Sequence, residues 1–153
     1  MSIQNGLAIT LQNRKALKKI LDFHSLEQLN QIPNGFNNNI LWNCAHVITV
    51  QQMLTYGLNN LPFGIPKEFV FRFTPGTKPD AVYDAAFVYD VKSLLFTSFE
   101  QFQADINDNK FVAFNPFMTA LKFEINDLEK AVAFNQYHES LHMGHILNLM
   151  KFV

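Results

Sequence analysis

The chain lacks the second cysteine that an internal disulfide requires, because Cys44 is the only cysteine among its 153 residues. It also lacks a basic N-terminal segment followed by a long apolar stretch, the pattern of a secretory signal. Both absences favour a cytoplasmic location, where thiols stay reduced. We expect Cys44 to be a small buried hydrophobic residue rather than a metal ligand.

An excess of charge of one sign is also missing. Twelve Lys and Arg stand against thirteen Asp and Glu, for a formal net charge of −1. Nucleic acids and anionic membrane surfaces are bound through clustered basic residues, so neither is an expected partner. No apolar run reaches the roughly 18 positions that a membrane-spanning helix needs. We therefore expect a soluble protein.

Glycine and proline are scarce, with six of each, and hydrophobic residues make up 48% of the chain. A chain of this size and composition can bury one core, so we expect a single domain over residues 1–153. Apolar residues recur at three- and four-residue steps, which predicts long helices over residues 8–23, 38–56, 90–107 and 126–150. A short helix is expected after Ser25, which forms a capping-box pattern with Gln28.

Two connections between the long helices are unusually long. Residues 58–90 hold four of the six prolines and leave no room for another long helix. Within this segment, residues 69–73 are interpreted as a short extended piece. Residues 110–125, around Pro116, are expected to form an irregular connection or a short hairpin. The predicted architecture is an all-α four-helix bundle with long crossover connections.

Three histidines are spaced so that they can meet in the core. His138 and His142 are one helical turn apart and belong to an apolar stripe that must face the bundle interior. His46 occupies the equivalent stripe of the helix predicted over residues 38–56. Three imidazoles with an open fourth position form the donor set of catalytic zinc sites. We predict that His46, His138 and His142 hold one divalent metal ion.

Other interpretations of these histidines exist. A single core histidine is more often hydrogen-bonded than metal-bound, and His138 with His142 also fits a partly exposed polar patch. His145 is the spare ligand, but it lies about 10 Å along the helix from His138, so lining the pocket or hydrogen-bonding a ligand suits it better. Trp42, Asn43 and Asn135 share the two stripes and receive the same assignment, whereas His24 is expected to end the first helix.

Residues 138–142 also match H-E-x-x-H, the helix of zinc peptidases in which the glutamate is the general base. The extended form of the motif fails, because His145 stands at its glycine position and Asn148 at its last histidine position. Peptidase activity is therefore the least favoured function. Glu139 is the one catalytic candidate, with a salt-bridging role on the helix as the alternative.

Several segments resemble the DinB/YfiT-like superfamily of metalloenzymes. Residues 25–33 and 36–43 resemble the segment that leads to the family's first metal-binding histidine, which corresponds to His46. The sequence Gly-Thr-Lys-Pro at residues 76–79 resembles a recurrent loop element of the family. Residues 133–144 resemble its histidine pair and the glycine that follows. The resemblance covers most of the chain.

The resemblance implies a four-helix bundle of unusual connectivity, frequent homodimers, and nickel or zinc on His46, His138 and His142. Many relatives carry glutamine at the position of His145. Members with known activity are transferases and isomerases that work with low-molecular-weight thiols, whose thiolate the metal is thought to activate. We accordingly expect a metal-dependent transferase that conjugates such a thiol to a small electrophile. The alternative is a non-catalytic metal-binding or stress-response protein.

Overall fold

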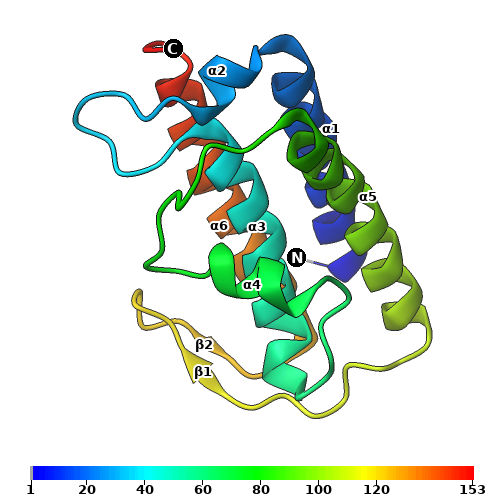
Figure 1. Cartoon of the computed structure of the whole chain (residues 1–153). Helices are drawn as coiled ribbons and strands as arrows, with labels where there is room; N and C mark the ends of the chain where they lie inside the picture. Colours follow the sequence, from blue (N-terminus) through cyan, green and yellow to red (C-terminus); the bar gives the residue numbers. More distant parts are fainter. Residues whose placement is uncertain (1) are drawn as a thin grey trace.

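The computed structural model describes residues 2–153 and consists mainly of four long helices (Figure 1). These are α1 (Ile3–Phe23), α3 (Ile40–Thr55), α5 (Ala85–Asn107) and α6 (Leu128–Leu149). Shorter pieces lie between them: α2 (Leu26–Asn30), a single 3-10 turn (Gly57–Asn59) and α4 (Lys67–Arg72). The prediction of an all-α fold is confirmed. Within residues 2–153, no helix combines the length and the apolar character that crossing a bilayer demands.

The four long helices contact one another in a ring. Helices α1 and α3 each pack against both α5 and α6. In Figure 1, α6 runs parallel to α1 and antiparallel to α3. The main hydrophobic core takes side chains from all four, such as Leu17, Ile48, Leu95 and Leu149. The long connection between α3 and α5 follows from this arrangement, since these two helices run in the same direction and the chain must return between them (Figure 1).

The helix boundaries follow the capping residues. Asn39 caps α3, because its side chain accepts the Trp42 backbone N–H at 2.8 Å. Asp84 caps α5 in the same way, so this helix begins five residues before its predicted start. Asp127 caps α6, so this helix begins at Leu128, two residues after its predicted start. The capping box between Ser25 and Gln28 is confirmed.

The first helix is longer than predicted. It begins at Ile3 with Ser2 as its cap, five residues before the expected start. The early turns are ordered against α6, where Gly6 allows a close approach of the two helices. A Cβ atom at Gly6 would lie 2.4 Å from Cγ1 of Val132 and 2.5 Å from Nε2 of Gln136. Only a glycine fits this crossing without a shift of its neighbours.

Residues 69–73 are not extended, and the prediction for this segment was wrong. They belong to α4 and its C-terminal end. Phe69, Val70 and Phe73 are buried while Phe71 is exposed, a pattern that fits one face of a helix and not the alternation of a strand. Of the two structures expected for residues 110–125, an irregular connection or a short hairpin, the chain forms the hairpin, with β1 (Phe117–Met118) pairing antiparallel to β2 (Glu124–Ile125).

Candidate metal centre

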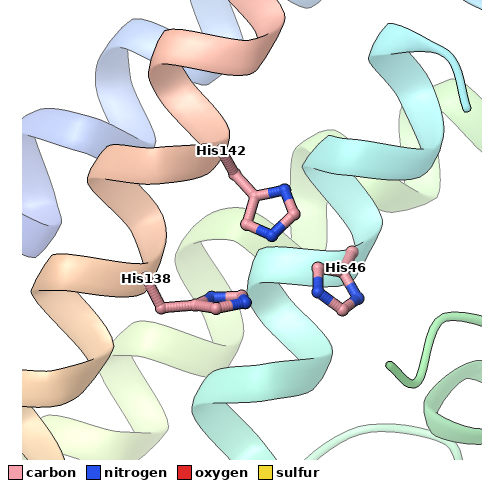
Figure 2. Close-up of side chains that lie close together, drawn as sticks. All are labelled: His46, His138 and His142. Carbon is pink, nitrogen blue, oxygen red and sulfur yellow. The ribbon is translucent and has the colours of Figure 1, made fainter. Parts of the chain in front are cut away.

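The side chains of His46, His138 and His142 meet between α3 and α6. Figure 2 shows the rings of His138 and His142 reaching from α6 toward the ring of His46 on α3. One ring nitrogen from each lies within 4.8 Å of the others. The ring centroids are 5.1 Å apart for His46 and His138, 4.6 Å for His46 and His142, and 4.5 Å for His138 and His142. The geometry brings together the three histidines that the spacing singled out.

The imidazole of His46 is held on two sides. Its Nδ1 lies 2.6 Å from the backbone carbonyl oxygen of Phe73. A carbonyl only accepts hydrogen bonds, so Nδ1 carries the proton and Nε2 keeps a free lone pair. The ring of Trp42 stacks on His46 with centroids 4.5 Å apart and planes inclined by 13°. His46 therefore presents Nε2 in a fixed orientation.

The imidazole of His142 is oriented by Asn43. The amide nitrogen of Asn43 donates to the Asn39 carbonyl at 2.7 Å, which fixes the orientation of the amide group. Its oxygen Oδ1 then faces Nδ1 of His142 at 2.7 Å. Nδ1 of His142 is the donor in this bond, and Nε2 is again left with its lone pair. Two of the three histidines are thus prepared as ligands through the same ring nitrogen.

His145 is turned away from the cluster. Its Nε2 lies 2.9 Å from Oδ1 of Asn38, an oxygen that also accepts from the Asn43 amide at 3.0 Å. Its ring packs against Phe36 with centroids 5.6 Å apart. His145 is connected to His142 through these two asparagines, and in residues 2–153 the ligand cluster contains the other three histidines only.

Burial lowers the pKa of all three clustered histidines. The pKa values of His138 and His142 fall to about 3, because burial disfavours the cation and the neighbouring imidazoles add electrostatic repulsion. All three rings are therefore neutral at pH 7, the form that binds metals. Nδ1 of His138 is buried and has no hydrogen-bond partner in the described part of the chain. Three neutral, converging imidazoles fit a divalent metal ion.

Glu139 lies about 100° around α6 from His138 and is engaged elsewhere. Its Oε1 accepts a hydrogen bond of 2.7 Å from Arg14 of α1 and one of 3.1 Å from Asn135. Arg14 also donates to Gln51 of α3 at 3.1 Å. A peptidase needs a free carboxylate beside the metal, and Glu139 is committed to a buried ion pair. The amide of Asn135, which was expected to line the pocket or to hydrogen-bond a ligand, donates to Glu139 of this ion pair.

Arg14, Gln51 and the Phe73 carbonyl were not among the residues singled out from the sequence. Arg14 could have been found, since it continues the buried stripe of Leu7, Thr10, Leu17 and Leu21 at helical spacing. The Phe73 carbonyl belongs to the main chain and leaves no signal in the sequence. His24 lies at the end of α1, as predicted, with its Nδ1 at 2.8 Å from the Ile20 carbonyl oxygen.

Cys44 lies on α3 two residues before His46, and its side chain is buried. Burial raises the pKa of the thiol to about 12. The residue is therefore a packed, neutral side chain, as its position on the helix predicts.

Comparison with known proteins agrees with the helices and the histidine cluster. The family model of the DinB superfamily matches residues 9–146, which is nearly the whole chain. None of the curated proteins matches the sequence. The matched segment includes all three clustered histidines and the elements that orient them. The chain belongs to the DinB superfamily.

Proposed function

We propose that the chain binds one zinc or nickel ion on His46, His138 and His142 and conjugates a low-molecular-weight thiol to a small electrophile. One observation carries the proposal. Three neutral imidazoles converge, two of them fixed by hydrogen bonds, while His138 and His142 remain partly exposed to solvent. This arrangement leaves an approach to the ion from outside. A bound divalent metal lowers the pKa of a thiol, so that the nucleophilic thiolate is present at neutral pH.

The thiol in this reaction comes from a substrate. Cys44 is the only cysteine of the chain, and its buried thiol stays protonated. In the proposed step the substrate sulfur forms a bond to an electrophilic carbon, and the leaving group departs with the electron pair of the bond that breaks. The thiol proton passes to solvent. The chain contributes orientation and charge rather than a nucleophile of its own.

An apolar hollow beside α6 suits the electrophile. It has a volume of about 250 Å³ and is lined by Leu121, Phe123, Ala133, Phe134 and Tyr137. Phe134 lies four residues before His138, so the two side chains are neighbours on the helix surface. Another hollow, of about 430 Å³, lies between α4 and α5. We assign the apolar part of the electrophile to the hollow beside α6 because it adjoins the ligand-bearing face of this helix.

Protein purified without an affinity tag and reloaded with zinc or nickel would test this function. Chlorodinitrobenzene serves as the electrophile, with glutathione, cysteine and a small aliphatic thiol as donors, and chloride release reports turnover. We expect the metal-loaded protein to release chloride faster than the metal-free protein and faster than the His138→Ala variant. His24→Ala, which changes a histidine outside the cluster, is the matched control and should keep the activity.

The non-catalytic alternative gives a different result in the same experiment. It predicts stoichiometric metal uptake with rates equal to those of the metal-free protein for every thiol. An unsaturated carbonyl compound used as a second electrophile extends the test to addition reactions, in which no group leaves. If the metal-loaded and metal-free proteins react at the same rate with each of the two electrophiles, the transferase proposal is overturned. The metal site would stand.

A further inference from the structure

The backbone carbonyl that orients His46 lies at the end of a short helix. Phe73 is the C-terminal cap of α4, and its own N–H still bonds to the Phe69 carbonyl at 3.3 Å. The carbonyl of a cap residue has no partner within its helix and is free to accept from another group. Here that group is Nδ1 of His46. The position of the carbonyl therefore depends on how α4 ends and how the chain continues.

A cluster of side chains holds the chain just after this carbonyl. Arg72 donates to Asp80 through Nε at 3.1 Å and through Nη2 at 2.9 Å. The hydroxyl of Tyr83 donates to Oδ1 of the same carboxylate at 2.5 Å. These bonds lower the pKa of Asp80 to about 2, so the carboxylate is ionised at any physiological pH. The residue before Phe73 is thus tied to a point eight residues further along the chain.

Thr77 makes a second tie. Its hydroxyl lies 2.9 Å from the Arg72 carbonyl oxygen and 2.8 Å from that of Thr74. The Thr77 backbone N–H closes the turn onto the Thr74 carbonyl at 3.2 Å. Gly76 supplies the left-handed conformation that this turn requires, with φ of +88°. Gly76 and Thr77 belong to the Gly-Thr-Lys-Pro element at residues 76–79, none of which is a ligand in the histidine cluster.

Packing of the Phe73 ring in the core also holds the main chain at this residue. Phe73 is fully buried, and its ring packs against those of Phe69, Tyr83 and Phe87 with centroids 4.8, 5.9 and 5.7 Å apart. The Arg72 guanidinium lies over the Tyr83 ring at 5.1 Å. Tyr83 therefore serves both the polar cluster and the aromatic packing. Together they leave the Phe73 carbonyl little freedom to move.

We propose that residues 72–83, here called the anchor loop, are the device that positions the metal ligand His46. Arg72, Thr77 and Asp80 act through the Phe73 carbonyl, which selects the Nδ1–H tautomer and the ring orientation. The loop matters because the ligands are held unequally: His46 and His142 each have an orienting partner, whereas Nδ1 of His138 has none within residues 2–153. Loosening the loop removes one of two anchors. The inference rests on the three-histidine site and not on thiol transfer.

Metal titration of isosteric variants tests this role. Asp80→Asn removes the charged pairing with Arg72, and Thr77→Val removes the hydroxyl. Groups that hydrogen-bond a ligand directly typically contribute 10- to 100-fold to metal affinity. Asp80 and Thr77 act one step further out, through the Phe73 carbonyl, so the Kd for zinc should rise severalfold, up to about tenfold, in each variant. Thr77→Ser should restore wild-type affinity. Asp22→Asn, which breaks ion pairs with Lys18 and Lys92 on another part of the surface, should leave the Kd unchanged.

A second readout separates positioning from stability. Long-range proton-nitrogen NMR correlations of the metal-free protein at neutral pH report the tautomer of each histidine. We expect His46 to be the Nδ1–H tautomer in the wild type and a mixture in Asp80→Asn, with His142 unchanged. The proposal is overturned if folded Asp80→Asn and Thr77→Val variants keep the wild-type His46 tautomer and the wild-type Kd for zinc. A lower melting temperature of these variants would not rescue it. Arg72→Lys is a milder variant that keeps the charge and must shift both readouts in the same direction.

Discussion

Arg14 of α1 and Glu139 of α6 form a salt bridge of 2.7 Å with almost no solvent exposure, at 0% and 1% of their side-chain surfaces. Each charge compensates the other in a setting where neither is hydrated. Removing one partner of such a pair leaves an uncompensated buried charge, whereas replacing both by apolar residues is often neutral. The pair connects the first and last long helices, so its energetics can be measured through global unfolding.

Arg14→Met should lower the free energy of unfolding by about 3–5 kcal/mol, because Glu139 then remains buried without its cation. The double variant Arg14→Met with Glu139→Leu should recover most of this loss. Urea unfolding followed by circular dichroism measures both. Lys18→Met is the control, since its pair with Asp22 is exposed and should contribute no more than about 1 kcal/mol. A double variant as unstable as Arg14→Met would contradict the argument.

Metal content should depend on three histidines and not on the fourth. His46→Ala should abolish binding of zinc or nickel, and His145→Gln should leave it nearly unchanged, because His145 bonds to Asn38 and lies outside the cluster. Elemental analysis after dialysis gives the stoichiometry. A chelator should also lower the melting temperature of the loaded wild type, since the ion binds the folded site preferentially, but not that of His46→Ala. Loss of metal in His145→Gln would point to a closed four-histidine site.

The metal-free protein should lose stability as the pH falls below about 6.5. The pKa values of His138 and His142 are about 3 in the folded chain and about 6.5 when unfolded, so the unfolded state binds more protons between these limits. Each histidine then contributes a slope of up to about 1.4 kcal/mol per pH unit. Urea unfolding midpoints measured in the presence of a chelator, between pH 7 and 5, give this slope. Most carboxylates titrate below this pH range and therefore add little to it.

Replacing His138 and His142 by glutamine should flatten this pH dependence. His24→Gln should not, because His24 lies at the end of α1 outside the cluster. An unchanged slope in the double variant would mean that other groups cause the acid sensitivity.

Two glycines in helices should respond in opposite directions to alanine. A Cβ atom added at Gly144 of α6 would have no other side chain or loop within 4 Å, so Gly144→Ala should stabilise the protein by up to about 1 kcal/mol through helix propensity. Gly6→Ala should destabilise it by about 1–3 kcal/mol, because the new Cβ would overlap Val132 and Gln136 at the α1–α6 crossing. Melting temperatures of the two variants and the wild type measure these effects. A Gly6→Ala variant that is more stable than the wild type would refute the close approach of α1 and α6 at Gly6.

The sequence predicts the parts of this molecule that depend on periodicity. The spacing of His138 and His142 and the phase of His46 sufficed to predict the cluster, because an α-helix fixes which residues share a face. The start of α5 was missed, because residues 58–90 were taken together as one proline-rich crossover, which hid the cap at Asp84. Residues 69–73 were misread because a run of aromatic and β-branched residues is also typical of strands. In the structure this segment is helical, because its buried side chains lie on one face of α4.

The partners of the ligands were harder to predict. Asn43 was found because it shares the face of His46, whereas the Phe73 carbonyl depends on a tertiary contact across 27 residues of chain. Glu139 was assigned from a motif, and only the packing of α1 against α6 reveals Arg14 as its partner. The single domain, the cytoplasmic location and the homodimer stay predictions.

The burial of Cys44 has a practical consequence for following the anchor loop in solution. A thiol held protonated inside the core does not react with maleimide probes, so the native chain gives no background labelling. Val82, which is 87% exposed, lies within the anchor loop. A Val82→Cys chain would therefore carry one fluorophore at one known place while keeping its native cysteine. Its emission would report movement of the loop as metal is added or withdrawn.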